Sequence, residues 1–160
     1  MTDELRAAIA SLLSIAPEDV AEFGMWVEAA SHLELATLLK AHGFGLYVTV
    51  VASHWPEQKK SRKVPEDVPE HLQVATVLRD PSKGQSTTFS WRVKLGMDEE
   101  IPSLVSLFAG ADWQEREQFD LVGVRFSGHP DLRRLMMPDD WEGHPLRRDY
   151  AIDTSHHPWR

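Results

Sequence analysis

The sequence predicts an α+β fold: a small α/β domain with a mixed or antiparallel meandering sheet and two main helices, followed by an extended, irregular C-terminal arm. Three observations predict it. Helical and strand periodicities alternate in the first half, two strand-like runs flank a tight turn, and from Pro102 onward closely spaced turn residues replace regular periodicity. We place the domain at residues 1–123 and the arm at residues 124–160.

The first quarter of the chain predicts a helix, a strand and a second helix. Residues 3–13 carry leucine and isoleucine at helical spacing. Residues 23–28 are typical of a short strand. The second helix is expected to begin at Ser31, whose hydroxyl would form a capping box with Glu34, and to end near His42.

The middle of the chain predicts strands. Residues 46–53 are apolar on both faces, so we expect a strand that is covered on two sides. Residues 54–70 contain three prolines and the basic run Lys59–Lys63, which indicates a mobile, solvated loop. Residues 72–79 and 88–95 flank a turn, and the second of these runs alternates apolar and polar residues. The pattern predicts an antiparallel hairpin with one buried face.

Two further helices are expected before the arm. Residues 103–108 predict a short apolar helix that is closed by Gly110. A longer helix is expected from Asp112 or Trp113 to Val122, with Gly123 placed to end it. Beyond this point turn residues recur every few positions, which favours an extended backbone whose amides need partners.

Composition excludes several classes of function. The chain has no cysteine, so it offers no disulfide, no thiolate nucleophile and no cysteine ligand for zinc or an iron–sulfur cluster. A net charge of −8 argues against nucleic-acid binding. No apolar run reaches the ~18 residues of a membrane span, and the acidic start is unlike a secretory signal. We therefore expect membrane contact through partners alone.

Carboxylates surround Arg116 in the last predicted helix. Asp112 and Asp120 lie one helical turn away on either side, and Glu115 and Glu117 are adjacent. We expect ion pairs along the helix. A neighbouring arginine lowers the pKa of a carboxyl group, which is the wrong direction for an acid that acts near neutral pH, so general acid–base catalysis is not expected.

Histidine and aspartate also raise the alternative of a metallo-hydrolase. Gly-His-Pro occurs twice, with His129 and His144, and acidic residues lie nearby: Asp131, Asp139, Asp140 and Asp149. No helical spacing fixes two of these groups on one face, which argues against a metal site. All basic residues after Lys94 are arginine, the residue suited to interfacial pairing, although arginine number alone also allows a module that binds small acidic ligands.

Two stretches carry a family resemblance. Residues 115–136 read EREQFDLVGVRFSGHPDLRRLM, and residues 138–150 read PDDWEGHPLRRDY. Together they resemble the signature of the 30-kDa subunit of respiratory complex I, which in bacteria is the C subunit of NADH–quinone oxidoreductase. The resemblance is strong over about a third of the chain, and the preceding α/β part agrees in order and length.

The resemblance implies a non-catalytic structural subunit in the peripheral arm of a proton-pumping NADH:quinone oxidoreductase. Its partners would be chiefly the 49-kDa-type D subunit and the cluster-bearing B and I subunits. No catalytic, cofactor-binding or metal residue is expected in this chain, and FMN, iron–sulfur clusters and quinone would lie on other subunits. The place would be the cytoplasmic face of the bacterial inner membrane, as a peripheral protein. The alternative is the equivalent subunit of a membrane-bound hydrogenase or formate hydrogenlyase.

The expected subunit interface follows the signature. We expect Trp141, Leu146 and Tyr150 to be apolar anchors in the partner, while Arg147 and Arg148, followed by Asp149, either pair across the interface or fold back on one another. The signature and interface residues are Glu115, Arg116, Glu117, Asp120, His129, Arg133, Arg134, Asp139, Trp141, His144, Arg147, Arg148, Asp149 and Tyr150.

Overall fold

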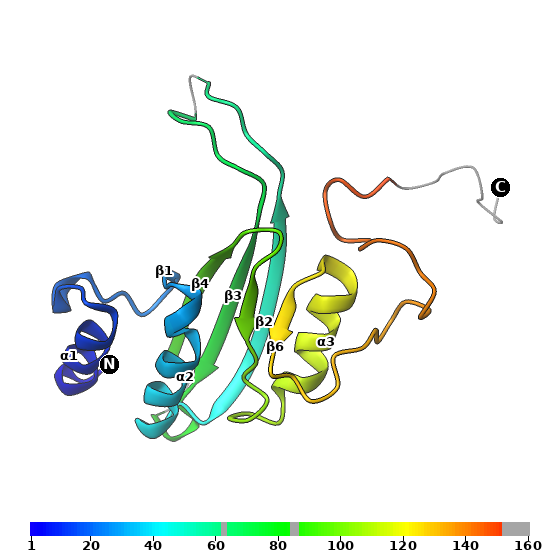
Figure 1. Cartoon of the computed structure of the whole chain (residues 1–160). Coiled ribbons are helices and arrows are strands. Elements are labelled where there is room, and N and C mark those ends of the chain that lie inside the picture. Colours follow the sequence, from blue (N-terminus) through cyan, green and yellow to red (C-terminus); the bar gives the residue numbers. More distant parts are fainter. Residues whose placement is uncertain (62–63, 84–86, 152–160) are drawn as a thin grey trace.

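The fold is that of a computed structural model, described for residues 1–61, 64–83 and 87–151 (Figure 1). The elements run in the order α1 (Asp3–Leu13), β1 (Met25–Trp26), α2 (His32–Ala41), β2 (Leu46–Trp55), β3 (His71–Arg79), β4 (Thr88–Leu95), β5 (Glu100–Pro102), α3 (Ala111–Val122) and β6 (Arg125–Ser127). Short 3-10 turns lie at Pro17–Asp19, Ala29–Ser31 and Pro81–Lys83. The predicted bounds of α1 and the end of α3 are confirmed.

Four strands form the main sheet, in the order β1-β4-β3-β2. β3 pairs antiparallel with both β2 and β4, whereas β1 runs parallel to β4. The mixed, largely antiparallel sheet and its β3–β4 hairpin are therefore confirmed. β5 and β6 form a separate parallel pair that no periodicity predicts, because each strand is three residues long.

The core of the domain lies between one face of the sheet and the helices. The predicted alternation of β4 is confirmed, since its apolar side chains are buried and those between them are not. Buried side chains from α1, α2 and β4 meet there: Leu5, Ile9, Leu35, Leu39, Phe89, Trp91, Val93 and Leu95. Val124 and Phe126 also belong to this core, so the irregular part of the chain follows β6.

A buried polar pair joins α2 to the sheet. The indole Nε1–H of Trp91 donates to Nδ1 of His32 over 2.9 Å, and both side chains are buried. Burial lowers the pKa of His32 to about 3, because a charged imidazole would lose its hydration there. The ring therefore stays neutral at physiological pH, and its unprotonated Nδ1 accepts the hydrogen bond from the indole N–H.

α3 covers the outer edge of the sheet. β2 is an edge strand, and its outward amides would otherwise be open to pairing with another chain. The side-chain oxygen of Gln114 accepts from Val50 N (3.1 Å), and that of Gln118 accepts from Ala52 N (2.9 Å). Gln114 also donates to the carbonyl of Val48. Two glutamines of one helix thus satisfy the strand edge and fix α3 beside β2.

Two local predictions are wrong. Ser31 makes no side-chain bond at the start of α2, because a 3-10 turn leads into the helix and leaves Ser31 at φ −87°, ψ −3° instead of the extended conformation of a capping residue. Residues 103–108 form turns and not a helix. There the amide of Leu104 donates a hydrogen bond to the carboxylate of Glu115, which belongs to α3.

The interpretation of residues 46–70 also needs correction. β2 is not covered on both sides, because Val48 and Val51 are 42% and 55% exposed. The strand continues to Trp55, which places His54 inside it and not in a loop. Residues 56–61 and 64–70 then project beyond the sheet and are joined by backbone bonds between Gln58 and Val68 (Figure 1). We call this segment the projecting hairpin; its residues 62–63, part of the basic run, lie outside the described structure.

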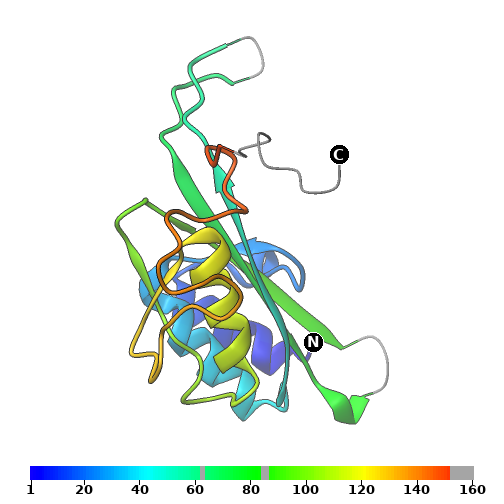
Figure 2. The ribbon, with the colours of Figure 1, turned by 90° about the vertical axis from the view of Figure 1, so that its right-hand side faces the viewer.

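The described part of the C-terminal segment, residues 128–151, follows α3 back toward the projecting hairpin (Figure 2). We call it the arm. It contains no helix or strand and carries the turn residues that the sequence analysis noted. The division of the chain at residue 123 stays a prediction, and residues 152–160 lie outside the described part. No described helix has the length and apolar character of a membrane span.

Candidate functional site

The arm closes the C-terminal end of α3. The last carbonyls of a helix have no partner within the helix and must find one elsewhere. Leu146 N donates to the carbonyl of Leu121 over 2.9 Å, and Arg147 Nε donates to the carbonyl of Val122 over 2.6 Å. Gly123 N binds the carbonyls of Gln118 and Phe119, and the arm supplies partners for the later carbonyls of Leu121 and Val122.

The Asp120 carboxylate is the centre of this contact. It is completely buried, and its Oδ2 accepts from the amides of Leu135 (3.0 Å), Met136 (2.6 Å) and Met137 (2.9 Å). Its Oδ1 accepts from Arg134 Nη1 over 2.7 Å. Burial alone would raise the pKa of Asp120, but these hydrogen bonds outweigh it and lower the pKa to about 2. The carboxylate is therefore ionised and binds three consecutive amides of the arm.

Arg134 extends the same network along the arm. Besides the Asp120 carboxylate, its Nη1 reaches the Asp120 carbonyl at 3.2 Å. Its Nη2 donates to the carbonyls of Trp141 (2.8 Å) and Gly143 (3.0 Å). The guanidinium group thus ties two distant parts of the arm to one point on α3, a use that suits its planar, multidentate form.

His144 and Gly123 meet at the end of the helix. Nδ1 of His144 lies 2.9 Å from the carbonyl of Asp120, and since a carbonyl can only accept, Nδ1 carries the proton. Burial, and then the cations of Arg147 and Arg134, lower the pKa of His144, so the ring is neutral. Gly123 has φ +86°, and a Cβ there would lie 2.7 Å from the His144 ring. Glycine is needed for both reasons.

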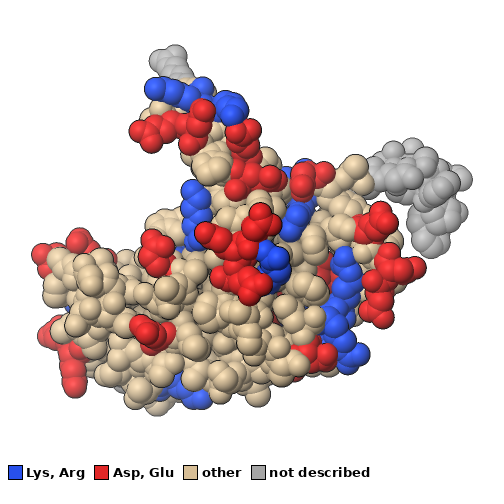
Figure 3. All heavy atoms as spheres, viewed as in Figure 1, with Lys and Arg blue, Asp and Glu red and all other residues tan. Residues whose placement is uncertain are grey.

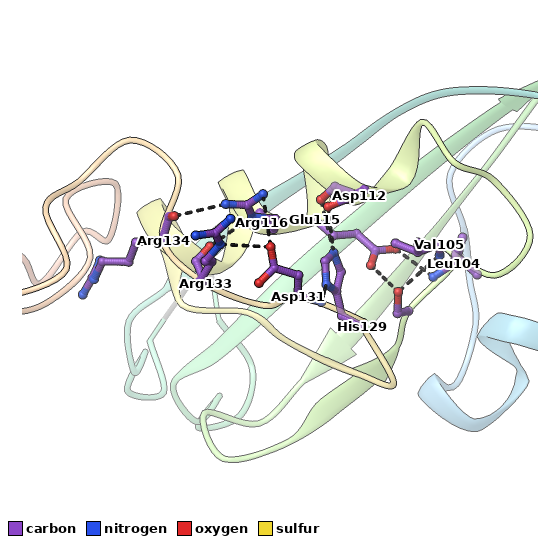
Figure 4. Close-up of polar contacts among 10 residues, drawn as sticks. Leu104, Val105, Asp112, Glu115, Arg116, His129, Asp131, Arg133 and Arg134 are labelled. Atoms are coloured by element: carbon purple, nitrogen blue, oxygen red, sulfur yellow. Dashed lines mark hydrogen bonds and ion pairs between the residues drawn. The ribbon is translucent and has the colours of Figure 1, made fainter.

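The expected ion pairs of Arg116 along α3 are wrong. Its guanidinium donates instead to the carbonyls of Arg133 (3.3 Å) and Arg134 (3.4 Å), and it lies 3.8 Å from the carboxylate of Asp131 (Figure 4). The helical neighbours Asp112 and Asp120 have other partners. Spacing along the helix shows which side chains can meet on one face, but not that the arm covers this face and supplies other partners.

Glu115 points from α3 into the β5–α3 connection. It accepts from Ser103 Oγ (2.6 Å) and Leu104 N (2.8 Å), and it is buried (Figure 4). Burial raises the pKa of Glu115, and the two hydrogen bonds offset this only in part. The expectation that Arg116 lowers the pKa of its neighbouring carboxyl groups is therefore wrong for Glu115. The pKa of Asp120 is lowered, but the amides of the arm and Arg134 lower it, and not Arg116.

His129 holds the beginning of the arm. Its Nδ1 accepts from Asp131 N over 3.0 Å, so the proton lies on Nε2, which is 3.3 Å from the carbonyl of Asp112 (Figure 4). The two histidines of the Gly-His-Pro repeats thus bind carbonyls of Asp112 and Asp120, two turns apart on α3. Each histidine fastens one part of the arm to α3, and the two rings do not come together as metal ligands would.

The end of the arm rests on the root of the projecting hairpin. Arg148 N donates to Nδ1 of His54 over 3.1 Å, and the Arg148 guanidinium lies 4.8 Å from the centre of the Trp55 ring. Trp55 in turn stacks on His71. Nε2 of His54 lies 2.8 Å from Glu70. Arg147 and Arg148 therefore bind other parts of this chain, which was not predicted: the two expected alternatives were pairing across an interface and folding back on one another.

These contacts bring together a group of possible metal ligands that the sequence did not predict. Atoms of His54, Glu70 and Asp149 lie within 4.8 Å of one another. The group does not fit a metal centre, because the lone pair of Nδ1 receives the amide of Arg148 and Nε2–H faces Glu70, which leaves His54 without a free donor atom. Neither His129 nor His144 belongs to a group of this kind within the described residues.

The fourteen predicted interface residues divide into three sets. Those whose side chains or backbone fasten the arm to the domain are Arg116, Asp120, His129, Arg133, Arg134, His144, Arg147 and Arg148. Glu115 binds within the domain, and the others are Glu117, Asp139, Trp141, Asp149 and Tyr150. Sequence reasoning missed His54, although the inward alternation of Val50, Ala52 and His54 along β2 was the signal that could have found it.

Large apolar side chains remain exposed on the arm side. Met136, Trp141 and Leu146 are 62%, 40% and 63% exposed, although the backbone beside each is bound to α3 or Arg134. Acidic and basic side chains lie next to each other over the same region (Figure 3). A fixed backbone with exposed apolar side chains is typical of a protein interface.

Comparisons with known proteins agree on one family. The profile described as "Respiratory-chain NADH dehydrogenase, 30 Kd subunit" matches residues 25–156. The C subunit of NADH-quinone oxidoreductase from Moorella thermoacetica is 40% identical over 132 residues, which cover 80% of this chain and 79% of that protein. The J subunit of NAD(P)H-quinone oxidoreductase from Synechococcus sp. (strain WH7803) is 39% identical over 137 residues, 84% of this chain and 72% of that protein.

A solved structure has a similar fold. It is titled "Nqo5 of the trypsin-resistant fragment (1-134) in P63 form" and shares 26% sequence identity at a TM-score of 0.52. The similarity covers 67% of this chain and 80% of that one.

Proposed function

Because this chain belongs to the family of the 30 Kd subunit of respiratory-chain NADH dehydrogenase, complex I, we propose that it acts there as a structural subunit and performs no redox step itself. The family resemblance of residues 115–150 is confirmed by the comparisons. The relatives are named for NADH–quinone or NAD(P)H–quinone oxidoreductases, which favours this complex over the hydrogenase alternative.

The proposal that the chain carries no redox centre is supported by its chemistry. It has no cysteine for an iron–sulfur cluster. The titratable groups at the candidate site, Asp120, His129 and His144, are occupied in holding the arm. FMN, the clusters and quinone would therefore lie on other subunits, and the reaction from NADH to quinone would belong to the assembled complex.

The partners in this proposal are the 49-kDa-type D subunit and the cluster-bearing B and I subunits. The observation that carries it is the exposure of Met136, Trp141 and Leu146 on an arm whose backbone is pinned to α3. Pinning lowers the entropy lost on docking, and large apolar side chains dominate interface energies. The complex would place the chain at the cytoplasmic face of the bacterial inner membrane, with lipid contact made by other subunits.

The test removes the exposed anchors without touching the fold. We expect Trp141→Ala with Leu146→Ala to lower the amount of flavin- and cluster-bearing subunits that co-purify with the tagged full chain by more than about tenfold, since buried interface anchors are worth about 2 kcal/mol or more each. The measurement is quantitative mass spectrometry after mild solubilisation of membranes, together with NADH-oxidising activity.

The matched control replaces two apolar residues of similar exposure on β2, Leu46→Ala with Val48→Ala. We expect this control to assemble as the wild type does, and both variants to unfold at the wild-type temperature in the isolated chain. Normal co-purification of the Trp141/Leu146 variant would contradict the proposed role of the arm.

A further inference from the structure

The main sheet has a second face that the core does not use. The register places Val50, Thr76, Trp91 and Met25 in one row across the four strands, and all four are buried. The adjacent row, Val51, Ala75, Arg92 and Trp26, faces the other way. In it Val51 and Trp26 are 55% and 53% exposed, and Arg92 is also exposed. We call this the outer sheet face.

Two hollows meet on the outer sheet face, and Trp26 and Lys94 line both. The first, of about 400 Å³, reaches Leu13 and Ile15 at the end of α1. The second, of about 310 Å³, lies between Trp26 and Trp55, the latter at the root of the projecting hairpin. An apolar wall on either side of a lysine makes a groove for a segment that carries both apolar and charged side chains.

Two basic side chains lie on the outer sheet face: Lys94 lines both hollows, and Arg92, which lines neither, lies beside Trp26. Lys94 and Arg92 are exposed, and neither has a carboxylate within ion-pair distance among the described residues. Arg92 instead lies 5.6 Å from the centre of the Trp26 ring. The chain has a net charge of −8, and on this apolar face two cations without acidic partners lie two residues apart on β4. Of the residues that the structure describes, Glu28 is the one acidic residue that lines either hollow.

We propose that the outer sheet face is a second docking surface, separate from the arm, and that its occupant is an acidic, partly apolar segment of a neighbouring protein subunit. Carboxylates of that segment would pair with Lys94 and Arg92, and its apolar side chains would fill the hollows on either side of Trp26. The inference rests on the proposed function, because a subunit of a large complex needs contacts on more than one side.

The test places a photo-reactive group at each surface of the full chain in living cells. Trp26 is replaced by p-benzoyl-phenylalanine in one strain and Trp141 in another, and the cross-linked peptides of the native complex are identified by mass spectrometry. We expect position 26 to cross-link to an Asp- or Glu-containing segment of another subunit. Position 141 tests the arm independently.

Charge variants show whether the pairing is electrostatic. We expect Arg92→Glu with Lys94→Glu to lower the yield of the position-26 cross-link about threefold to tenfold, as the loss of two exposed ion pairs implies, and to leave position 141 unchanged. The matched control, Arg92→Lys with Lys94→Arg, keeps the charge and should keep the cross-link. The same yield in the reversed and the conserved variants would overturn the proposed pairing.

The outcomes separate the two proposals. A cross-link from position 141 together with none from position 26, or with one to a second copy of this chain, to lipid or to a basic segment, overturns the second surface and leaves the proposed function intact. The absence of cross-links from both positions would contradict the proposed function as well.

Discussion

Asp120→Asn should release the arm from α3. The substitution keeps the shape of the side chain but removes the charge that pairs with Arg134, and it turns an amide group toward amides that need an acceptor. Removing one partner of a buried charged network costs about 3–5 kcal/mol. We expect a loss of about 3 kcal/mol in the free energy of unfolding, measured by urea denaturation, and faster hydrogen exchange at the amides of Leu135, Met136 and Met137.

The matched control is Asp131→Asn, because this carboxylate pairs with Arg133 and Arg116 while being half exposed. Exposed pairs contribute up to about 1 kcal/mol, so the control should change little. If Asp120→Asn costs no more than Asp131→Asn, the Asp120 carboxylate is not what holds the arm.

Acid provides a second measurement on the same residue. The pKa of Asp120 is lowered from 3.8 to about 2 on folding, so its ionised form stabilises the protein above pH 3.8. This contribution, about 2 kcal/mol, is lost as the pH falls through 3.8 toward 2. The difference in stability between wild type and Asp120→Asn should therefore shrink between pH 5 and pH 2. A constant difference over this range would show that the ionised carboxylate has no special role.

Gly123→Ala should loosen the same end of the arm by a steric route. The residue has φ +86°, where a side chain costs about 1–2 kcal/mol, and the new Cβ would lie 2.7 Å from the His144 ring and against Arg147. We expect a total loss of about 2–4 kcal/mol in the free energy of unfolding, together with weaker protection of the Leu146 amide. Differential scanning calorimetry and hydrogen exchange measure the two effects.

Gly128→Ala is the control that separates the backbone strain of a positive φ from the steric crowding at Gly123. Gly128 has φ +77°, but nothing lies within 4 Å of a Cβ built there. The control should therefore show the backbone cost alone and leave the Leu146 amide protected. If both glycine variants behave alike, His144 and Arg147 do not hold the arm against the helix end.

Local pattern was a good guide where neighbours in sequence decide the structure. The apolar spacing of residues 3–13 predicts α1 with its observed bounds, and the alternation of residues 88–95 predicts which side chains of β4 are buried. Gly123 ends α3 as expected, because its positive φ is a property of that one position.

The predictions from local pattern failed where a group distant in sequence binds a backbone amide or covers one face of a helix. Residues 103–108 have helical composition, but Glu115 binds the amide of Leu104 and holds a turn. Arg116 has acidic neighbours at helical spacing, but the carbonyls of Arg133 and Arg134 replace them. Local spacing could not predict that Glu115 reaches Leu104, which lies in a different element. Nor could it predict the partners of Arg116, since the arm returns along α3 only in the folded chain.

The contacts that the signature residues make within the chain were not predicted. Arg134, His144 and Arg147 bind their own helix, and their role at a subunit interface stays a prediction. Trp141 and Leu146 beside them remain exposed. The chemistry of a residue type indicated strong pairing but not whether the second group lies in the same chain.

The most direct test of the structural role is NADH-dependent quinone reduction in membranes from a strain that lacks this gene, measured with the amount of assembled complex on native gels. We expect deletion to abolish both, the wild-type chain to restore both, and Asp120→Asn to restore them incompletely. Membranes that keep an assembled complex and a normal rate without this chain would contradict the role proposed for it.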